Sequence, residues 1–133
     1  MTVFVDSNIP MYLVGAEHPN KHAARTALER LAADGERLVT DAEVMQEILH
    51  RYGAIGRKDA IGPALDVLMG VVDEVFVIDG DAVTAAARLL ERVAGISARD
   101  ALHVITMRRH GVDDILTFDT GFDVISGLRR RPG

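Results

Sequence analysis

The chain of 133 residues contains no cysteine. This absence excludes a disulfide scaffold, a thiolate nucleophile and any zinc site built on sulfur, and it fits a reducing compartment. A bound metal would therefore need oxygen or imidazole ligands. None of the histidines forms the HExxH pattern or another close ligand pair, so a histidine-based zinc site or a catalytic histidine is not expected. The histidines are His18, His22, His50, His103 and His110.

Long apolar runs and phosphate-binding glycine loops are also absent. No stretch approaches the roughly 18 apolar residues that a membrane span needs, and the first residues do not resemble a cleavable leader, so we expect a cytoplasmic protein. Neither GxxxxGK nor GxGxxG occurs, which makes a nucleotide cofactor unexpected. With 48% hydrophobic residues, the chain can bury an ordinary core, and we expect a single domain over residues 1–133.

Positive charge is in deficit, since 15 Lys and Arg face 20 Asp and Glu for a formal net charge of −5. A basic surface normally favours phosphate contacts, so the net negative charge by itself argues against binding to nucleic acid. A carboxylate cluster that holds divalent cations is, however, far less acidic once loaded. Basic residues elsewhere could hold an RNA backbone, although a solvated helix face or a terminal tail is the better explanation for any single one of them. These residues are Arg51, Arg57, Lys58, Arg99, Arg108, Arg109, Arg129, Arg130 and Arg131.

Short apolar runs alternate with amphipathic segments along the chain. The runs are continuously apolar, which is typical of a sheet buried on both faces. We therefore predict an α/β fold with a mostly parallel central sheet flanked by α-helices. From about residue 126 we expect a last edge strand followed by a basic, frayed end. Expected strands cover residues 2–5, 37–40, 75–78 and 115–118, and expected helices cover residues 8–14, 22–33, 41–52, 60–71, 82–94 and 98–110.

Two aspartates follow predicted strands directly. Asp6 ends the first strand, and Asp119 ends the last, with Thr117 on the same side by the two-residue strand period. Ligands of open parallel sheets bind outside the carboxyl ends of the strands, so both acids stand where chemistry can occur. Each also has a structural alternative. Asp6 could cap the next helix, and Asp119 could shape the turn that leads to Gly121.

A third acid, Asp100, lies in the first turn of a predicted helix. It sits at the margin of the apolar stripe, from which a side chain can face a crevice. The helix N-terminus also tolerates a carboxylate there. The alternative is a capping box with Ser97, in which Asp100 has a purely structural role.

A fourth acid is chosen between two glutamates of the same predicted helix. Glu43 fits a capping box with Thr40 and lies nearly opposite the centre of the apolar stripe. Glu47 lies one turn later at the edge of that stripe, and we choose it as the functional acid. The alternative for Glu47 is an exposed pair with Arg51 at i,i+4.

In order and context, these acids resemble the PIN domain, the fold of many VapC-type toxins of bacterial toxin–antitoxin pairs. The resemblance covers essentially the whole chain and is carried by VFVDSNI at residues 3–9, VMQEIL at 44–49, SARDALH at 97–103 and TFDTGF at 117–122. It implies a parallel sheet flanked by helices, an acidic cluster that binds Mg²⁺ or Mn²⁺, and cleavage of single-stranded RNA. It also implies a VapB-like antitoxin and, frequently, a homodimer. The matching positions assign the catalytic and metal-binding acids as Asp6, Glu47, Asp100 and Asp119.

Mg²⁺ prefers oxygen ligands and keeps several waters, so a few carboxylates with free coordination positions suit it. We expect Asp6 and Asp119 to bind the ion directly, Asp100 to bind from the opposing helix, and Glu47 to bind it or to orient a coordinated water. The hydroxyls of Thr117 and Ser7 could fix these carboxylates. Glu43 competes with Glu47, and Asp123 could be an accessory acid.

Other functions remain as alternatives at this point. A phosphorelay receiver has similar length and layering, and Asp79 follows a predicted strand, but no late strand ends in the lysine that a receiver needs. A PIN-domain nuclease that processes RNA without an antitoxin would use the same acids. A PIN scaffold that only binds RNA would be expected to have lost some of them.

Overall fold

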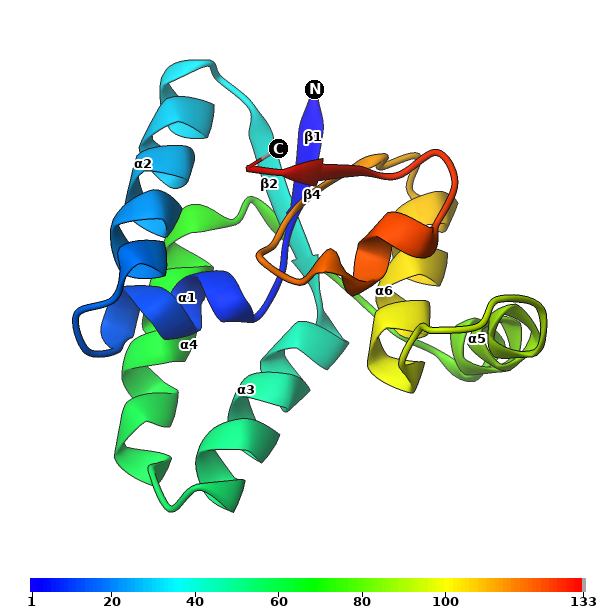
Figure 1. The fold of residues 1–133 in the computed structure, drawn as a ribbon, viewed down its shortest axis with the longest axis horizontal. Helices are drawn as coiled ribbons and strands as arrows, with labels where there is room; N and C mark the ends of the chain where they lie inside the picture. The colour runs from blue at the N-terminus through cyan, green and yellow to red at the C-terminus, as the bar shows by residue number, and fades with distance from the viewer. Residues whose placement is uncertain (133) are drawn as a thin grey trace.

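A five-stranded sheet runs through the middle of the molecule in the computed structural model, which describes residues 1–132 (Figure 1). The strand order is β3-β2-β1-β4-β5, and every neighbouring pair is parallel. The α/β prediction with a mostly parallel sheet is confirmed. The strands are β1 (Thr2–Val5), β2 (Arg37–Asp41), β3 (Glu74–Phe76), β4 (Asp114–Leu116) and β5 (Arg129–Arg131).

Helices cover both faces of this sheet. In Figure 1, α1, α2 and α4 lie on one side of the central strands, and α5 and α6 lie on the other. Helix α3 leaves the carboxyl end of β2 and contacts both α4 and α6. None of the helices within residues 1–132 is long and apolar enough to span a membrane. The helices are α1 (Asn8–Val14), α2 (Pro19–Ala33), α3 (Ala42–Ala54), α4 (Ile61–Val71), α5 (Gly80–Arg92) and α6 (Ala98–Arg109), with short 3₁₀ helices η1 (Lys58–Ala60) and η2 (Thr120–Val124).

The central strands are buried on both faces, which explains their continuously apolar sequence. Val3, Phe4 and Val5 of β1 and Ile115 and Leu116 of β4 are fully buried. Burying a large apolar side chain contributes about 1.5–3 kcal/mol. The core therefore holds β1, β2 and β4 rigidly side by side, and the carboxyl ends of these strands are fixed relative to one another.

Two helices begin earlier than the sequence pattern predicted. Helix α2 starts at Pro19 instead of residue 22, because the His18 ring accepts a hydrogen bond from the Asn20 amide (3.0 Å) and proline suits a first turn. Helix α5 starts at Gly80, two residues early, because the Asp79 carboxylate accepts from the Ala82 amide (2.8 Å). The spacing of apolar residues carries no information about these capping side chains, so it did not predict where the two helices start.

The basic tail forms part of the sheet. Arg129–Arg131 are strand β5, and Arg129 and Arg131 both pair with the buried Asp114 at 2.6 Å. Arg130 pairs with Asp123 at 2.9 Å. The edge strand that the sequence allowed is thus present, and its arginines are already paired with carboxylates. Gly133, the last residue of the predicted tail, lies outside the described residues.

Candidate active site

Polar side chains from three strands converge at the carboxyl edge of the sheet. Asp6 follows β1, Asp41 ends β2 and Thr117 follows β4. Because these three strands are neighbours in the order β2-β1-β4, their carboxyl ends meet at one place. Figure 1 shows the starts of α1 and α3 at the same edge.

Asp6 is the most tightly held of the predicted acids. It is only 3% exposed, its Oδ1 accepts from the Ser7 amide (2.7 Å), and its Oδ2 accepts from the Thr117 hydroxyl (2.7 Å). Asn8 fixes Thr117 in turn, since its Nδ2 donates to the Thr117 oxygen (2.9 Å). Helix α1 has Ser7 at its N-cap position, so Asp6 does not occupy the capping position that the sequence allowed. Burial raises the pKa of Asp6, partly offset by the charge of His103.

Glu47 comes from α3 and turns inward. It is 9% exposed, and it accepts hydrogen bonds from the Ser7 hydroxyl and from Arg99 Nη1 (3.3 Å). The exposed pair with Arg51, which was the structural alternative, is replaced by the salt bridge to Arg99 of α6. Glu43 is half-buried, and burial raises its pKa.

His103 is the residue that sequence reasoning missed. Its ring is fully buried, its Nδ1 lies 2.8 Å from Asp41 Oδ2, and its Nε2 lies 3.9 Å from Asp6 Oδ1. Burial alone would lower the pKa of His103, but the hydrogen bond and charge of Asp41, with the charges of Asp6 and Glu47, raise it to about 9. The available signal was its place three residues after Asp100 on the same helical face.

Three of these side chains lie close enough together to hold a metal ion. Asp6, Glu47 and His103 each offer one ligand atom, and the three atoms lie within 4.8 Å of one another. His103 Nε2 is buried and has no hydrogen-bond partner among residues 1–132. Two carboxylates and an orphaned imidazole nitrogen are a donor set that fits a divalent cation.

Asp100 and Asp119 lie outside this group of three but beside it. Together with Glu47 they line a crevice of about 450 Å³ between α3, α6 and the β4–η2 connection. Burial, followed by the charges of Asp6 and Asp119, raises the pKa of Asp100 to about 7. Asp100 therefore lies within the electrostatic reach of both Asp6 and Asp119. Two of the four predicted acids are buried, Asp100 is partly exposed and Asp119 is exposed.

A side-chain cap lies beside each crevice acid: Ser97 caps the backbone at Asp100, and the Asp119 carboxylate itself caps η2, as its structural alternative stated. The Asp100 amide donates to the Ser97 hydroxyl (3.1 Å) at the start of α6. The Asp119 carboxylate accepts from the Gly121 amide (2.8 Å) and caps η2. The strand β4 ends at Leu116, earlier than predicted, so Asp119 reaches the crevice from the start of η2.

Two other acids that the sequence raised lie away from the crevice. Asp123 pairs with Arg130 and is not among the crevice residues. Asp79, the aspartate considered for a phosphorelay receiver, caps α5 and pairs with Arg109 at 3.2 Å. Neither acid shares the buried arrangement around Asp6.

The chain matches the PIN domain family over residues 3–128. It is 54% identical over 128 residues to the ribonuclease VapC13 of Mycobacterium tuberculosis, and the match covers 96% of this chain and 98% of that one. Its fold is similar to that of Mycobacterium tuberculosis VapC20, a sarcin-ricin loop cleaving toxin, with a TM-score of 0.74, 24% identity and coverage of 91% and 92% of the two chains. A further similar structure is VapBC2 from Rickettsia felis bound to a DNA fragment from its promoter, with a TM-score of 0.74, 16% identity and 98% coverage of both chains. The resemblance that the four acidic segments indicated is thus confirmed, and the chain belongs to the PIN domain family, where it groups with the VapC ribonucleases.

Proposed function

We propose that this chain is a divalent-metal-dependent endoribonuclease that cuts single-stranded RNA at the crevice lined by Glu47, Asp100 and Asp119, with Asp6 behind it. The convergence of Asp6, Glu47 and the unpartnered His103 Nε2 carries the proposal, because three buried ligand atoms within 4.8 Å of one another can hold a divalent cation that displaces the proton of His103. Membership of the family and 54% identity to a ribonuclease support the reaction class.

The chain's own residues prepare the site in two ways. The Ser7 amide and the Thr117 hydroxyl hold both oxygens of Asp6, and the Ser7 hydroxyl and Arg99 hold Glu47, so the two carboxylates are oriented before any ligand arrives. Asp100, with its pKa near neutrality, can hold or release a proton at the crevice.

Mg²⁺ or Mn²⁺ would be held by Asp6 and Glu47, with Asp100 and Asp119 reaching it from the crevice side. When bound, such an ion activates water for in-line attack and offsets charge on the leaving oxygen. The expected products carry 5′-phosphate and 3′-hydroxyl ends.

We further propose that the chain is the toxin of a toxin–antitoxin pair and acts in the cytoplasm as a homodimer. The supporting observation is the likeness to VapC ribonucleases and to a VapBC structure. A VapB-like antitoxin would place an Arg or Lys in the acidic crevice, where it would compete with the cation and with RNA. A crystal of the complex with that crevice empty would contradict this contact.

The proposed reaction is tested with purified protein and a single-stranded RNA labelled at its 5′ end. We expect internal cleavage in Mg²⁺ or Mn²⁺, none in EDTA, and products whose 3′ ends can be extended by poly(A) polymerase. Cleavage that persists in EDTA, or products with 2′,3′-cyclic phosphates, would rule out the metal-dependent mechanism. Co-expression with the product of a short neighbouring reading frame tests the antitoxin.

A further inference from the structure

A second pocket opens beside the acidic crevice. It has a volume of about 620 Å³, within the range of about 300–1,000 Å³ that is typical of sites for small molecules and cofactors. Arg51 and Asp119 line both hollows, so the pocket adjoins the site of the proposed cleavage. The residues that line it are Asn8, Met11, Tyr12, Gly15, Ala16, Glu17, His18, Arg51, Tyr52, Phe118 and Asp119.

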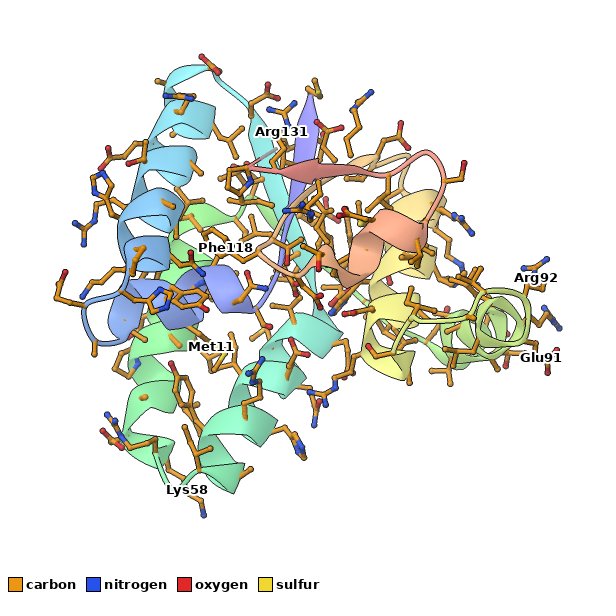
Figure 2. All side chains as sticks on the ribbon, viewed as in Figure 1. Met11, Lys58, Glu91, Arg92, Phe118 and Arg131 are labelled. Atoms are coloured by element: carbon orange, nitrogen blue, oxygen red, sulfur yellow. The ribbon has the colours of Figure 1, made fainter. Side chains whose placement is uncertain are left out.

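Aromatic rings dominate one side of this pocket. The Tyr12 ring lies 5.0 Å from the His18 ring and 5.4 Å from the Phe118 ring, centroid to centroid, and the Phe118 contact is edge-on. Tyr12 and Phe118 are half-buried and His18 is exposed. In Figure 2, Phe118 and Met11 lie on the same side of the molecule, over α1. The chain has only six Phe and Tyr residues, and three of them, Tyr12, Tyr52 and Phe118, line this one pocket.

Arg51 brings the positive charge that an RNA backbone needs. It is exposed, and no carboxylate pairs with it among residues 1–132, because its potential partner Glu47 is taken by Arg99. Most other basic candidates are already paired, as Arg57 is with Asp59 and Arg109 is with Asp79. Arg51 is therefore the cation free to contact a phosphate between the aromatic rings and the acids.

We propose that this aromatic pocket, defined by Tyr12, His18, Phe118 and Arg51, binds one unstacked base of the RNA strand whose neighbouring phosphodiester lies in the acidic crevice. The inference rests on the proposed ribonuclease function and adds a substrate-binding site to it. Proteins read single-stranded RNA by stacking splayed bases on aromatic side chains, which tolerates every base because each has a π-face.

The polar groups of the pocket favour a base over an apolar peptide side chain. His18 Nδ1 accepts a hydrogen bond from the Asn20 amide, so a neutral His18 carries its proton on Nε2 and can donate to an acceptor on a base. Glu17, the acid at the outer rim, lies 3.6 Å from Lys21, which offsets its charge. The cation Arg51 lies on the crevice side, where the strand must turn toward the acids.

Abasic scanning of a short RNA tests this assignment. Binding is measured by fluorescence anisotropy in the cleavage-deficient Asp6→Asn background, since Asp6 does not line the aromatic pocket. Removing the base at one position beside the cut should weaken binding roughly 5- to 100-fold, as expected for one lost stacking contact. Removing bases farther away should change it little.

Variants of the rings show whether that base occupies this pocket. Tyr12→Leu should weaken binding of intact RNA by a similar factor and make binding insensitive to the abasic position, whereas Tyr12→Phe should keep both properties. His18→Asn, which keeps a side-chain cap for α2 and removes a ring, gives an independent measurement if Tyr12→Leu fails to fold. A Tyr12→Leu or His18→Asn protein that still senses the abasic position overturns the proposal.

The charge is tested with a matched pair of arginine variants. Arg51→Gln should reduce the slope of log affinity against log salt concentration by about one. Arg92→Gln, at the last residue of α5 and on the side of the molecule away from α1 in Figure 2, should leave the slope unchanged. Cleavage by the wild type with a flat abasic scan would reject the pocket and leave the nuclease intact. Absence of both cleavage and RNA binding would reject the proposed function itself. Unchanged RNA binding with weakened antitoxin binding in Tyr12→Leu would assign the pocket to a peptide and overturn the proposal.

Discussion

Asp41 and His103 form a buried pair that joins the start of α3 to the middle of α6. Asp41 Oδ2 lies 2.8 Å from His103 Nδ1, while Asp41 Oδ1 caps α3 by accepting from the Val44 amide (2.9 Å). One carboxylate thus fixes a helix end and a histidine ring together, and the ring presents Nε2 to Asp6. Carboxylate–histidine pairs of this kind orient imidazoles behind metal sites.

Asp41→Asn should lower the pKa of His103 in the metal-free protein, because it removes the charge that holds the imidazolium. The raised pKa of His103, about 9 against 6.5, contributes stability that is fully present below pH 6.5 and is lost as pH rises through 9. The variant should therefore be less stable than the wild type at pH 6, by about 2 kcal/mol, and nearer to it at pH 9.5. Urea unfolding in EDTA at both pH values and an NMR titration of the ring measure this.

Asp79→Asn is the matched control for that variant. Asp79 caps α5 through the same kind of hydrogen bond but is far more exposed and does not contact His103. Asparagine caps helices about as well as aspartate, so neither substitution should lose its helix. An unchanged His103 pKa in Asp41→Asn would show that the pair is not an ion pair.

Asp6→Asn should lower metal-dependent RNA cleavage by at least roughly 100-fold while the protein stays folded. Asparagine keeps the size of Asp6 but removes the charge that a cation needs, and even residues behind metal ligands typically cost 10- to 100-fold. Single-turnover cleavage and circular dichroism check both parts. Asp66→Asn, at an exposed position of α4, should cleave like the wild type. Wild-type activity in a folded Asp6→Asn protein would remove Asp6 from the mechanism.

Glu47→Gln should be inactive and Glu43→Gln active. Glu47 is buried against Ser7 and shares the ligand geometry of Asp6, whereas Glu43 is half-buried on the next turn toward the helix start and outside that group. The two proteins differ from the wild type by the same atoms, so each controls for the other. The reverse pattern of cleavage rates would assign the catalytic role to Glu43.

Asp100→Asn should leave the metal-free protein as stable as the wild type at neutral pH or raise its stability by up to about 1 kcal/mol, since solvent screens part of the repulsion. Because folding raises the pKa of Asp100 from 3.8 to about 7, its contribution to stability is fully present below pH 3.8 and is lost as pH rises through 7. In the Asp100→Asn protein, the free energy of unfolding should not show this fall as pH rises. A purely structural cap predicts a loss instead, so thermal melts in EDTA at pH 5 and pH 8 distinguish the two by sign.

Mg²⁺ or Mn²⁺ at ~100 times its dissociation constant should stabilise the wild type by about 2.7 kcal/mol, because the ion binds the folded state only. For a chain of this length that is a rise in Tm of roughly 10 °C. Asp6→Asn and Asp100→Asn should each show a much smaller rise. An intact rise in Asp100→Asn, together with a lower Tm in EDTA, would make Asp100 a structural residue outside the metal site.

Local sequence determined the architecture and the position of the predicted acids along it. Short, continuously apolar runs between amphipathic segments allow few solutions other than a parallel sheet buried on both faces, and Asp6 follows one of those runs at the carboxyl edge. The boundaries were less accurate where side-chain caps decide them, as at Asp79 and His18. The assignment of Asp6, Glu47, Asp100 and Asp119 to catalysis stays a prediction.

Tertiary structure alone decided which side chains meet. His103 contacts Asp41 across 62 positions of sequence, and the Ser7 hydroxyl contacts Glu47 across 40. The local sequence around His103 gave no information on what packs against this fully buried ring, because its partner Asp41 comes from strand β2. The same reason explains why Glu47 pairs with Arg99 of α6 and leaves its own helical neighbour Arg51 exposed. Such contacts depend on how β2, α3 and α6 pack together, which local sequence patterns do not encode.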